Sequence, residues 1–290
     1  MTWLIFGAEG QLGQSLKKEL ESSNVQFYSF SRREINIEDS EAVVEIVRKY
    51  RPQVVVNCAA WTNVELAEKN FDEVISINGN SVIGLANASK LIGAVFVQIS
   101  TDYVFDGFKN YPFETSDMTN PVNVYGYSKE LGEINTLNNY PDGSYIFRTA
   151  WLYSEFGNNF VKKIANNAVL GVKSVVVDDQ HGQPTSANQL AKRIVESINK
   201  KIPFGIYHAT NSGRTTWFGF AKQIYSNLNQ ATNLVIPTQT TTNNSTVIRP
   251  EFTVLSHRCW SNIGFGPMAD WTQALALDLP AIVSKIRSEV

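Results

Sequence analysis

The sequence has 290 residues, of which 43% are hydrophobic and 18% charged, with a formal net charge of −2. These values are typical of a globular protein of one or two domains, and they argue against nucleic acid or an anionic membrane as a partner, since both usually require a basic surface. No apolar stretch approaches the ~20 residues of a transmembrane helix, and the short apolar N-terminus lacks the basic start of a signal peptide, so we expect a cytoplasmic protein.

The first half of the chain alternates short apolar runs with amphipathic stretches. The apolar runs predict strands at 3–6, 25–30, 54–57, 95–100 and 144–147. The amphipathic stretches predict helices around 12–20, 42–47 and 82–88. Strands that alternate with helices in this way predict βαβ units and a parallel sheet.

After Arg148 the alternation becomes irregular. Helices are predicted at 160–170, 190–198 and 218–228, a strand at 205–208 and a polar surface loop at 238–246. We therefore expect an α/β fold in which residues 1–148 form a Rossmann-type, doubly wound parallel sheet that binds NADPH, with returning elements within about 186–210. A smaller, mixed α/β substrate-binding lobe is expected over 149–185 and 211–290.

Three glycines, Gly7, Gly10 and Gly13, lie between the first predicted strand and the first predicted helix. Glycine permits a tight turn and lets the backbone approach a pyrophosphate, whose charge is favoured at a helix N-terminus. An ordinary strand–helix turn has the same spacing, but its position at the start of a βα repeat favours a dinucleotide site.

The end of the second predicted strand indicates which dinucleotide binds. NAD sites usually have Asp or Glu there, about 20 residues beyond the glycines, to bind the ribose 2′-hydroxyl. This chain has Ser31, Arg32 and Arg33 before the first acidic residue, Glu34. A guanidinium group suits a 2′-phosphate, so NADPH is expected, with NADH as a second possible cofactor.

Tyr125 and Lys129 lie four residues apart and would project from one face of a helix. An ammonium group close to a phenol favours the phenolate, so such a tyrosine can act as an acid–base group near neutral pH. Thr101, at the end of a predicted strand, could donate a hydrogen bond to the same carbonyl oxygen. With 11 tyrosines such a pair also arises by chance. The three histidines, His181, His208 and His257, have no ligand spacing, so no catalytic metal is expected.

These residues resemble the catalytic set of the extended short-chain dehydrogenase/reductase superfamily, which is Ser/Thr, Tyr and Lys. Within it, the chain resembles the dTDP-4-dehydrorhamnose reductase family over nearly its whole length, less closely after about residue 230. The segments that carry the resemblance are FGAEGQLG (6–13), NCAAWTNV (57–64), STDYVFDG (100–107), NVYGYSK (123–129), RTAWLY (148–153), GNNF (157–160) and DDQHGQPT (178–185).

The resemblance implies roles for individual residues. The catalytic residues would be Thr101, Tyr125 and Lys129. The cofactor contacts would be Gly7, Gly10, Gln11, Leu12, Arg32, Asn36, Ile37, Ala59, Ala60, Tyr125 and Lys129. The sugar contacts would be Thr62, Val64, Asp102, Tyr103 and Trp151. Trp151 has an alternative interpretation as a core aromatic beside a strand.

The implied reaction is transfer of hydride from NADPH to C4 of a nucleotide-linked 4-keto-6-deoxyhexose, in the synthesis of deoxysugar precursors of cell-surface polysaccharides. Tyr125 would protonate the alkoxide, Lys129 would lower the pKa of Tyr125 and hold the nicotinamide ribose, and Thr101 would polarise the carbonyl. The family often has an acidic residue at the position of Ser15, which contributes to a magnesium-bridged dimer. Its absence here argues against Mg²⁺ and leaves a monomer or a homodimer.

Three other functions remain open. A 4,6-dehydratase or 4-epimerase would retain NAD, and a dehydratase commonly has Asp-Glu after its threonine, where this chain has Asp102 and Tyr103. The regulatory β subunit of methionine adenosyltransferase, which is not an enzyme itself, resembles the same reductases and keeps the Tyr/Lys pair, although Trp151 and Gly157–Phe160 fit the reductases better. A sister reductase of another 4-keto-6-deoxyhexose would use the same catalytic residues. The sequence does not identify the sugar or the C4 epimer that is made.

Overall fold

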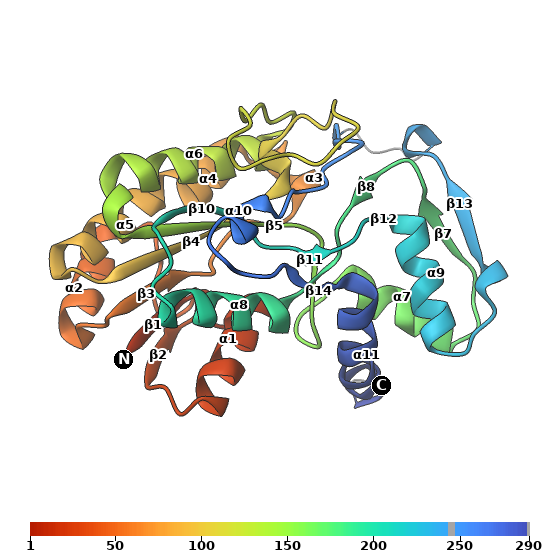
Figure 1. Cartoon of the computed structure of the whole chain (residues 1–290), viewed down its shortest axis with the longest axis horizontal. Coiled ribbons are helices and arrows are strands. Elements are labelled where there is room, and N and C mark those ends of the chain that lie inside the picture. The colour runs from red at the N-terminus through yellow and green to blue at the C-terminus, as the bar shows by residue number, and fades with distance from the viewer. Residues whose placement is uncertain (243–246, 289–290) are drawn as a thin grey trace.

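The computed structural model describes residues 1–242 and 247–288. Its centre is a six-stranded parallel sheet with the order β10-β5-β4-β3-β1-β2 (Figure 1). The strands are β1 (Trp3–Phe6), β2 (Phe27–Phe30), β3 (Val54–Asn57), β4 (Val95–Thr101), β5 (Ser144–Thr149) and β10 (Gly205–His208). The predicted parallel sheet and the return of 205–208 to it are both confirmed.

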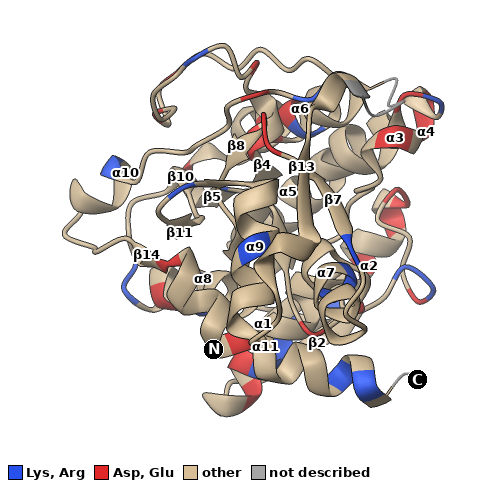
Figure 2. Ribbon diagram, turned by 90° about the vertical axis from the view of Figure 1, so that its right-hand side faces the viewer, with Lys and Arg blue, Asp and Glu red and all other residues tan. Residues whose placement is uncertain are grey.

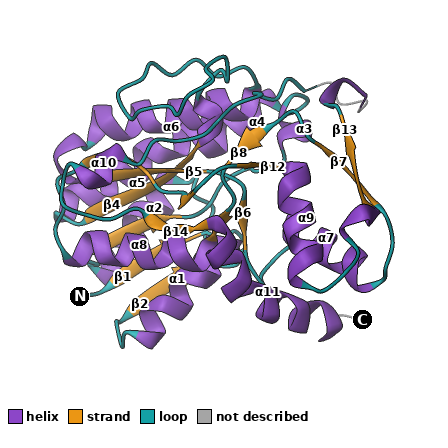
Figure 3. Ribbon diagram, turned by 45° about the vertical axis from the view of Figure 1, so that its right-hand side comes forward, coloured by secondary structure: helices purple, strands orange, loops and turns teal. Residues whose placement is uncertain are grey.

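Helices cover both faces of this sheet, as Figure 3 shows. One face carries α1 (Gln11–Ser22) and α8 (Ala187–Asn199), which pack against each other. The other carries α2 (Ser40–Tyr50), α5 (Ser81–Ile92) and α6 (Val124–Asn139). Each layer closes over its own apolar core because the strands are buried on both faces, which is typical of a doubly wound fold.

The strand order reverses at β1, because β2 lies on one side of it and β3 on the other. Ligands of open α/β sheets bind outside the carboxyl ends of the strands at such a switch point. The glycine turn follows β1, and Cys58–Ala60 follow β3, so both flank this point. A buried hydrogen bond from Asn57 Nδ2 to Gln98 Oε1 (2.9 Å) joins β3 to β4, and Asn57 Oδ1 accepts from Ala59 N (3.1 Å).

Beside the sheet, α7 (Phe160–Val169), α9 (Trp217–Asn227) and α11 (Trp271–Ser288) pack around a second apolar core. Figure 2 views this part of the molecule, with α7 and α9 next to the parallel pair β7 (Ser174–Val177) and β13 (Val235–Thr238). The other short strands are β6 (Leu152–Tyr153), β8 (His181–Gly182), β9 (Thr185–Ser186), β11 (Asn211–Ser212), β12 (Thr215–Thr216) and β14 (Met268–Asp270).

Several element boundaries differ from the prediction. The strand expected at 25–30 begins at Phe27, because Val25 N bonds back to Leu20 O (2.9 Å) at the end of α1. The short helices α3 (Val64–Ala67), α4 (Phe71–Ile75) and α10 (Arg258–Ser261), the π-helix Ser76–Asn80 and the long α11 were not predicted.

The loop predicted at 238–246 is only partly described. Thr238 ends β13, a 3₁₀ turn covers Thr240–Thr242, and 243–246 lie outside the described residues. Asp179 fixes this turn, accepting from Thr240 N (2.7 Å) and Oγ1 (2.6 Å). Within residues 1–242 and 247–288, no helix has the length and apolar character needed to cross a membrane.

Candidate active site

A cavity of about 550 Å³ lies at the carboxyl end of the sheet and brings the three predicted catalytic residues together. Thr101 ends β4, while Tyr125 and Lys129 lie on the first two turns of α6. Asn123 starts α6 by accepting a hydrogen bond from Gly126 N (2.8 Å), as a helix N-cap does. Gly126 allows close packing, since a Cβ there would lie 2.2 Å from the Tyr103 carbonyl oxygen.

Thr101 is buried and its hydroxyl is held by its neighbours. Oγ1 accepts from Tyr103 N (3.2 Å), which caps a short 3₁₀ helix at Asp102–Val104, and it donates to Asp102 Oδ1 (3.0 Å). The Thr101 side chain also lowers the pKa of Tyr125, which lines the same cavity. Thr101 therefore lies between the tyrosine and the carboxyl group in its effects at the wall of the cavity.

The pKa of Tyr125 differs from the expectation. Burial raises it, the Thr101 side chain opposes that rise, and Asp102 and Tyr103 add to it. The Lys129 ammonium is not among the groups that lower it, and its Nζ donates to the Ile99 carbonyl oxygen (2.6 Å). The prediction of a lowered tyrosine pKa was wrong for this structure, in which Tyr125 keeps its proton at neutral pH.

Lys129 is 3% exposed. Burial lowers its pKa to about 8, while Glu133 and then Cys58 act in the opposite direction. The ammonium group thus loses its proton near the upper end of the physiological range. Burial likewise raises the pKa of Asp102 to about 6, while the Thr253 and Thr101 side chains act in the opposite direction. Asp102 Oδ2 is buried and has no partner among the described residues.

The glycine turn has the geometry that a dinucleotide requires. Gly7 has φ +78°, and a Cβ there would lie 2.4 Å from Ala59 N, so only glycine fits. A Cβ on Gly13 would lie 2.4 Å from the Gly7 carbonyl oxygen. Gly10 starts α1 without a capping side chain, which leaves the first-turn N–H groups of Gln11 and Leu12 open to a ligand at the cavity wall.

A second cavity, of about 220 Å³, shares Gly10 and 58–60 with the first. It brings together further predicted cofactor residues, namely Gly7, Arg32, Asn36, Ile37, Ala59 and Ala60. The Arg32 side chain is 72% exposed and lies 3.4 Å from the Glu73 carboxylate. Because an exposed ion pair contributes little, the guanidinium can change partner. Every predicted cofactor residue lines one of these two cavities.

All five predicted sugar contacts line the larger cavity: Thr62, Val64, Asp102, Tyr103 and Trp151. Trp151 has φ +46°, an uncommon conformation for a residue with a side chain. Its ring stacks on Trp217 with centroids 3.7 Å apart and covers Gly182, where a Cβ would lie 2.6 Å from the indole. It is therefore not a simple core aromatic, since it forms part of the cavity wall.

Two other residues of this wall, Trp217 and Arg249, were not predicted, and Phe160 was expected only as part of the segment 157–160. All three line the catalytic cavity of about 550 Å³ and also an adjoining one of about 700 Å³ that contains Lys163 and Lys173. Figure 2 shows basic positions on α7 and at the start of β7. A lone Arg in the C-terminal part of the sequence carries no spacing signal, so only the fold identifies it.

Asn78 is a further residue that the sequence did not indicate. It lies in the π-helix, a feature frequent at functional sites. Its Oδ1 accepts from Trp61 N (2.8 Å), and its Nδ2 donates to Trp61 O (3.0 Å) and Ser128 Oγ (2.9 Å). Asn78 thus fastens the loop after β3 to the helix that carries Lys129.

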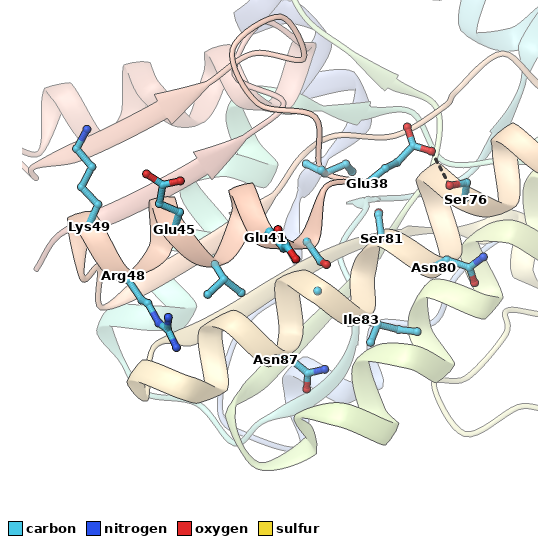
Figure 4. Close-up of a pocket in the computed structure, with 14 residues that line it drawn as sticks. Glu38, Glu41, Glu45, Arg48, Lys49, Ser76, Asn80, Ser81, Ile83 and Asn87 are labelled. Carbon is cyan, nitrogen blue, oxygen red and sulfur yellow. Dashed lines mark hydrogen bonds between the residues drawn. The ribbon is translucent and has the colours of Figure 1, made fainter.

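An open groove of about 1010 Å³ between α2 and α5 adjoins the second cavity, with which it shares Ile37 and Glu38 (Figure 4). Mixed charges line it, including Glu41, Glu45 and Arg48, and a hydrogen bond joins Glu38 to Ser76 at one end. None of the predicted catalytic residues lines it.

In the described ranges, no group of three or more His, Cys, Asp or Glu side chains could hold a metal, and Ser15 is buried in α1. The expectation about Mg²⁺ stays a prediction.

The chain is similar to a dTDP-4-dehydrorhamnose reductase of Streptomyces griseus, with 39% identity over 287 residues that cover 98% of this chain and 94% of that protein. A dTDP-4-keto-6-deoxy-D-glucose reductase of Streptomyces niveus is 36% identical over 97% of both chains. The solved structure of a dTDP-4-dehydrorhamnose reductase of Bacillus anthracis in complex with NADP superposes with a TM-score of 0.92 at 35% identity, covering 96% of this chain and 98% of that one.

These relatives match almost the full chain, including the second apolar core as well as the parallel sheet. The family model described as the RmlD substrate binding domain matches residues 1–282, which contain every cavity-lining residue discussed above. Sequence, fold and family model agree, and the chain belongs to the RmlD substrate binding domain family.

Proposed function

We propose that this protein is an oxidoreductase that uses NADPH to reduce the C4 keto group of dTDP-4-dehydro-L-rhamnose to dTDP-L-rhamnose. The observation that carries the proposal is the convergence of Thr101, Tyr125 and Lys129, from separate segments, on one cavity that adjoins the glycine turn. The relatives named dTDP-4-dehydrorhamnose reductase support the choice of substrate.

The residues present fit a dinucleotide. The uncapped start of α1 suits the pyrophosphate, Gly7 lets the backbone approach it, and Arg32 suits a 2′-phosphate better than a hydroxyl group. NADPH is therefore the preferred cofactor. When bound, it supplies the hydride that reduces C4.

The side chains of this protein donate the proton to the C4 oxygen and stabilise the negative charge that develops on it. Tyr125 holds its proton at neutral pH and gives it to the C4 oxygen as that oxygen gains charge. Thr101 polarises the same oxygen once its hydroxyl turns from Asp102. The Lys129 ammonium, which contacts the Ile99 carbonyl in this structure, stabilises the phenolate that remains on Tyr125.

The substrate's nucleotide end fits the basic cavity beside the catalytic one. Lys163, Lys173 and Arg249 line this space of about 700 Å³ together with Glu65, which pairs with Arg249 (2.8 Å), and the remaining positive charge suits a diphosphate. Trp151 and Trp217, whose rings stack on each other, would line one side of the sugar site between this cavity and Tyr125. The two walls come from different parts of the chain, so the substrate spans the lobe 149–185 and 211–290 and the Rossmann domain 1–148 that we propose.

The test is NADPH oxidation followed at 340 nm with enzymatically generated dTDP-4-dehydro-L-rhamnose, with the product identified by NMR. We expect turnover to dTDP-L-rhamnose. Tight NADPH binding without turnover of this sugar would contradict the proposal. We further propose a cytoplasmic enzyme that acts as a monomer or a homodimer, which size-exclusion chromatography with light scattering would distinguish.

A sister reductase is the second candidate. The Streptomyces niveus relative, whose name gives a 4-keto-6-deoxy-D-glucose as substrate, is nearly as similar as the first. Catalytic residues would be the same, and only the sugar pocket around Trp151 and Tyr103 would differ. Turnover of dTDP-4-keto-6-deoxy-D-glucose at a higher kcat/KM than that of dTDP-4-dehydro-L-rhamnose would favour this candidate.

A further inference from the structure

A row of buried polar side chains continues from Lys129 away from the cavity. Glu133 lies one turn further along α6 and is 3% exposed. Arg148, on β5, donates to both of its carboxylate oxygens, from Nε to Oε1 (2.8 Å) and from Nη2 to Oε2 (2.6 Å). His208, on β10, ends the row with its Nε2 3.4 Å from Arg148 Nη1. None of these three residues has a role in the mechanism above.

The contacts of His208 define its protonation state. Burial, and then the charge of Arg148, lower the pKa of His208 to about 3, so the imidazole is neutral. Its Nδ1 lies 3.1 Å from the Ser256 carbonyl oxygen and donates to it, which leaves Nε2 to accept from Arg148. Arg148 also packs on the Phe105 ring, 5.0 Å from its centroid. Arg148 therefore contacts Glu133, His208 and the Phe105 ring, and its two hydrogen bonds orient the Glu133 carboxylate.

Glu133 acts on Lys129 from the same helix face. It opposes the effect of burial on the lysine pKa, and Cys58, after β3, acts in the same direction. Burial raises the pKa of Cys58 to about 12, so this thiol is uncharged at neutral pH. Tyr125 lies one turn before Lys129 on α6 and lines the same cavity, and Asp102, at the end of β4, acts on Tyr125. Glu133 is thus the carboxylate that acts on the ammonium group.

We propose that Glu133, oriented by Arg148, is a positioning residue of the active site, whose carboxylate retains the positive charge of Lys129 in a buried environment. The inference rests on the proposed reductase function and extends the active site to a residue that does not line the cavity. A buried ammonium group without such a partner would lose its proton.

The proposal fixes the direction of a pH effect. Reduction requires Tyr125 and Lys129 both to carry their protons. Loss of one proton from either group makes the pair more negative, and a nearby carboxylate opposes that loss. Removal of the Glu133 charge therefore moves the first deprotonation of the pair to lower pH, whichever group loses its proton.

The experiment compares Glu133→Gln with Glu130→Gln, a control on the same helix beside Lys129 with no resolved role in the row. NADPH affinity is measured by fluorescence titration from pH 6.5 to 9.5, together with kcat/KM for the keto sugar. For Glu133→Gln we expect the alkaline limb of both profiles to move down by about one pH unit, while Glu130→Gln follows the wild type. If Glu133→Gln folds and the alkaline limbs of its NADPH-affinity and kcat/KM profiles stay where they are in the wild type, the proposal is overturned.

The affinity profile needs no turnover, so it separates this inference from the proposed function. A wild-type protein that binds NADPH but reduces no keto sugar would contradict the function, and the shift in affinity would still decide the role of Glu133. Glu133→Asp keeps the carboxylate charge, so the alkaline limb of its NADPH-affinity profile should stay near that of the wild type.

Glu133→Gln leaves Arg148 buried without its partner, which can prevent folding. The double variant Glu133→Gln/Arg148→Met removes both charges and carries the same test. Because the Glu133 carboxylate is the charge that acts on the lysine pKa, the alkaline limb of the double variant should also move to lower pH, by less than in Glu133→Gln because the Arg148 charge is removed as well. A purely structural pair would instead lower the melting temperature and leave both limbs in place, which would overturn the proposal.

Discussion

The Tyr125 proton is held more tightly than that of a tyrosine in water, because burial disfavours the phenolate. This suits a donor, which must keep its proton until the substrate oxygen becomes negative. The cost is a phenolate that must then be stabilised, and Lys129 is the cation within the same cavity. A sequence pattern identifies this pair but not its resting state, since the contact of Lys129 with the Ile99 carbonyl depends on the packing of α6 against β4.

Replacing Tyr125 by Phe removes the proton donor and leaves the shape of the cavity nearly unchanged. We expect kcat to fall by ~10²-fold or more. NADPH affinity should stay within about twofold, because the ring remains in place. Stopped-flow turnover and fluorescence titration measure the two quantities, and normal turnover would show that another group donates the proton.

Arg32 is the predicted contact of the 2′-phosphate, and its exposed position lets it leave Glu73. Arg32→Ala should weaken NADPH binding by ~10-fold or more, as expected for the loss of a charge-assisted hydrogen bond. NADH binding should change little. Arg33→Ala is the matched control, since Arg33 is also exposed but does not line the cofactor cavity. An equal loss for both cofactors in Arg32→Ala would contradict this role.

At the scale of elements, apolar runs and helical spacing predicted the strands of the central sheet and most of the long helices. The π-helix was missed because Ser76–Asn80 has the composition of a loop. It is helical because Asn78 bonds the backbone of Trp61 and because Gly79 packs on Leu131, where a Cβ would lie 2.6 Å from Cδ2. Pro280 lies inside α11 and breaks the sequence signal there, although the helix continues through it against the second core. Both cases depend on tertiary contacts that local sequence does not encode.

The turn after β1 offers a test of why glycine is required. Gly7→Ala combines strain from φ +78° with a clash against Ala59 N at 2.4 Å. Gly171→Ala is the matched control, because Gly171 has φ +65° and open space around it. We expect a loss of about 1–2 kcal/mol in the free energy of unfolding for Gly171→Ala and about 1–3 kcal/mol more for Gly7→Ala.

Urea denaturation measures these losses, and cofactor affinity gives a second comparison. NADPH binding should weaken strongly in Gly7→Ala, because the turn has to open, and should be unchanged in Gly171→Ala. Equal losses of stability in the two variants would mean that backbone strain alone requires the glycine.

At the scale of the whole molecule, the site is formed where the parallel sheet meets the second core. The resemblance to the reductase family predicted most residues of each wall, and these residues do line two adjoining cavities. It did not predict Trp217 or Arg249, because their contribution depends on how distant segments pack. Trp217 reaches the cavity by stacking on Trp151, a pairing that no spacing in the sequence encodes.

Gln11 connects the two sides and leads to the last prediction. Its backbone belongs to the glycine turn, while its side chain bonds the segment that leads to α7. Oε1 accepts from Asn159 Nδ2 (2.9 Å) and Ser154 Oγ (3.2 Å), and Nε2 donates to Leu152 O (3.4 Å).

Gln11→Ala keeps the backbone N–H for the cofactor but removes the side-chain bonds that hold this wall of the substrate cavity. The KM for the keto sugar should therefore rise ~10-fold, as expected for a loss of about 1.4 kcal/mol from such bonds, while NADPH affinity stays within about twofold. Gln14→Ala, whose side chain bonds only the nearby Glu9 carbonyl, should leave both unchanged. If Gln11→Ala weakened NADPH as much as the sugar, the side chain would be serving the glycine turn itself, and the two walls would have to be held together by other contacts, such as the ion pair between Lys18 and Glu155.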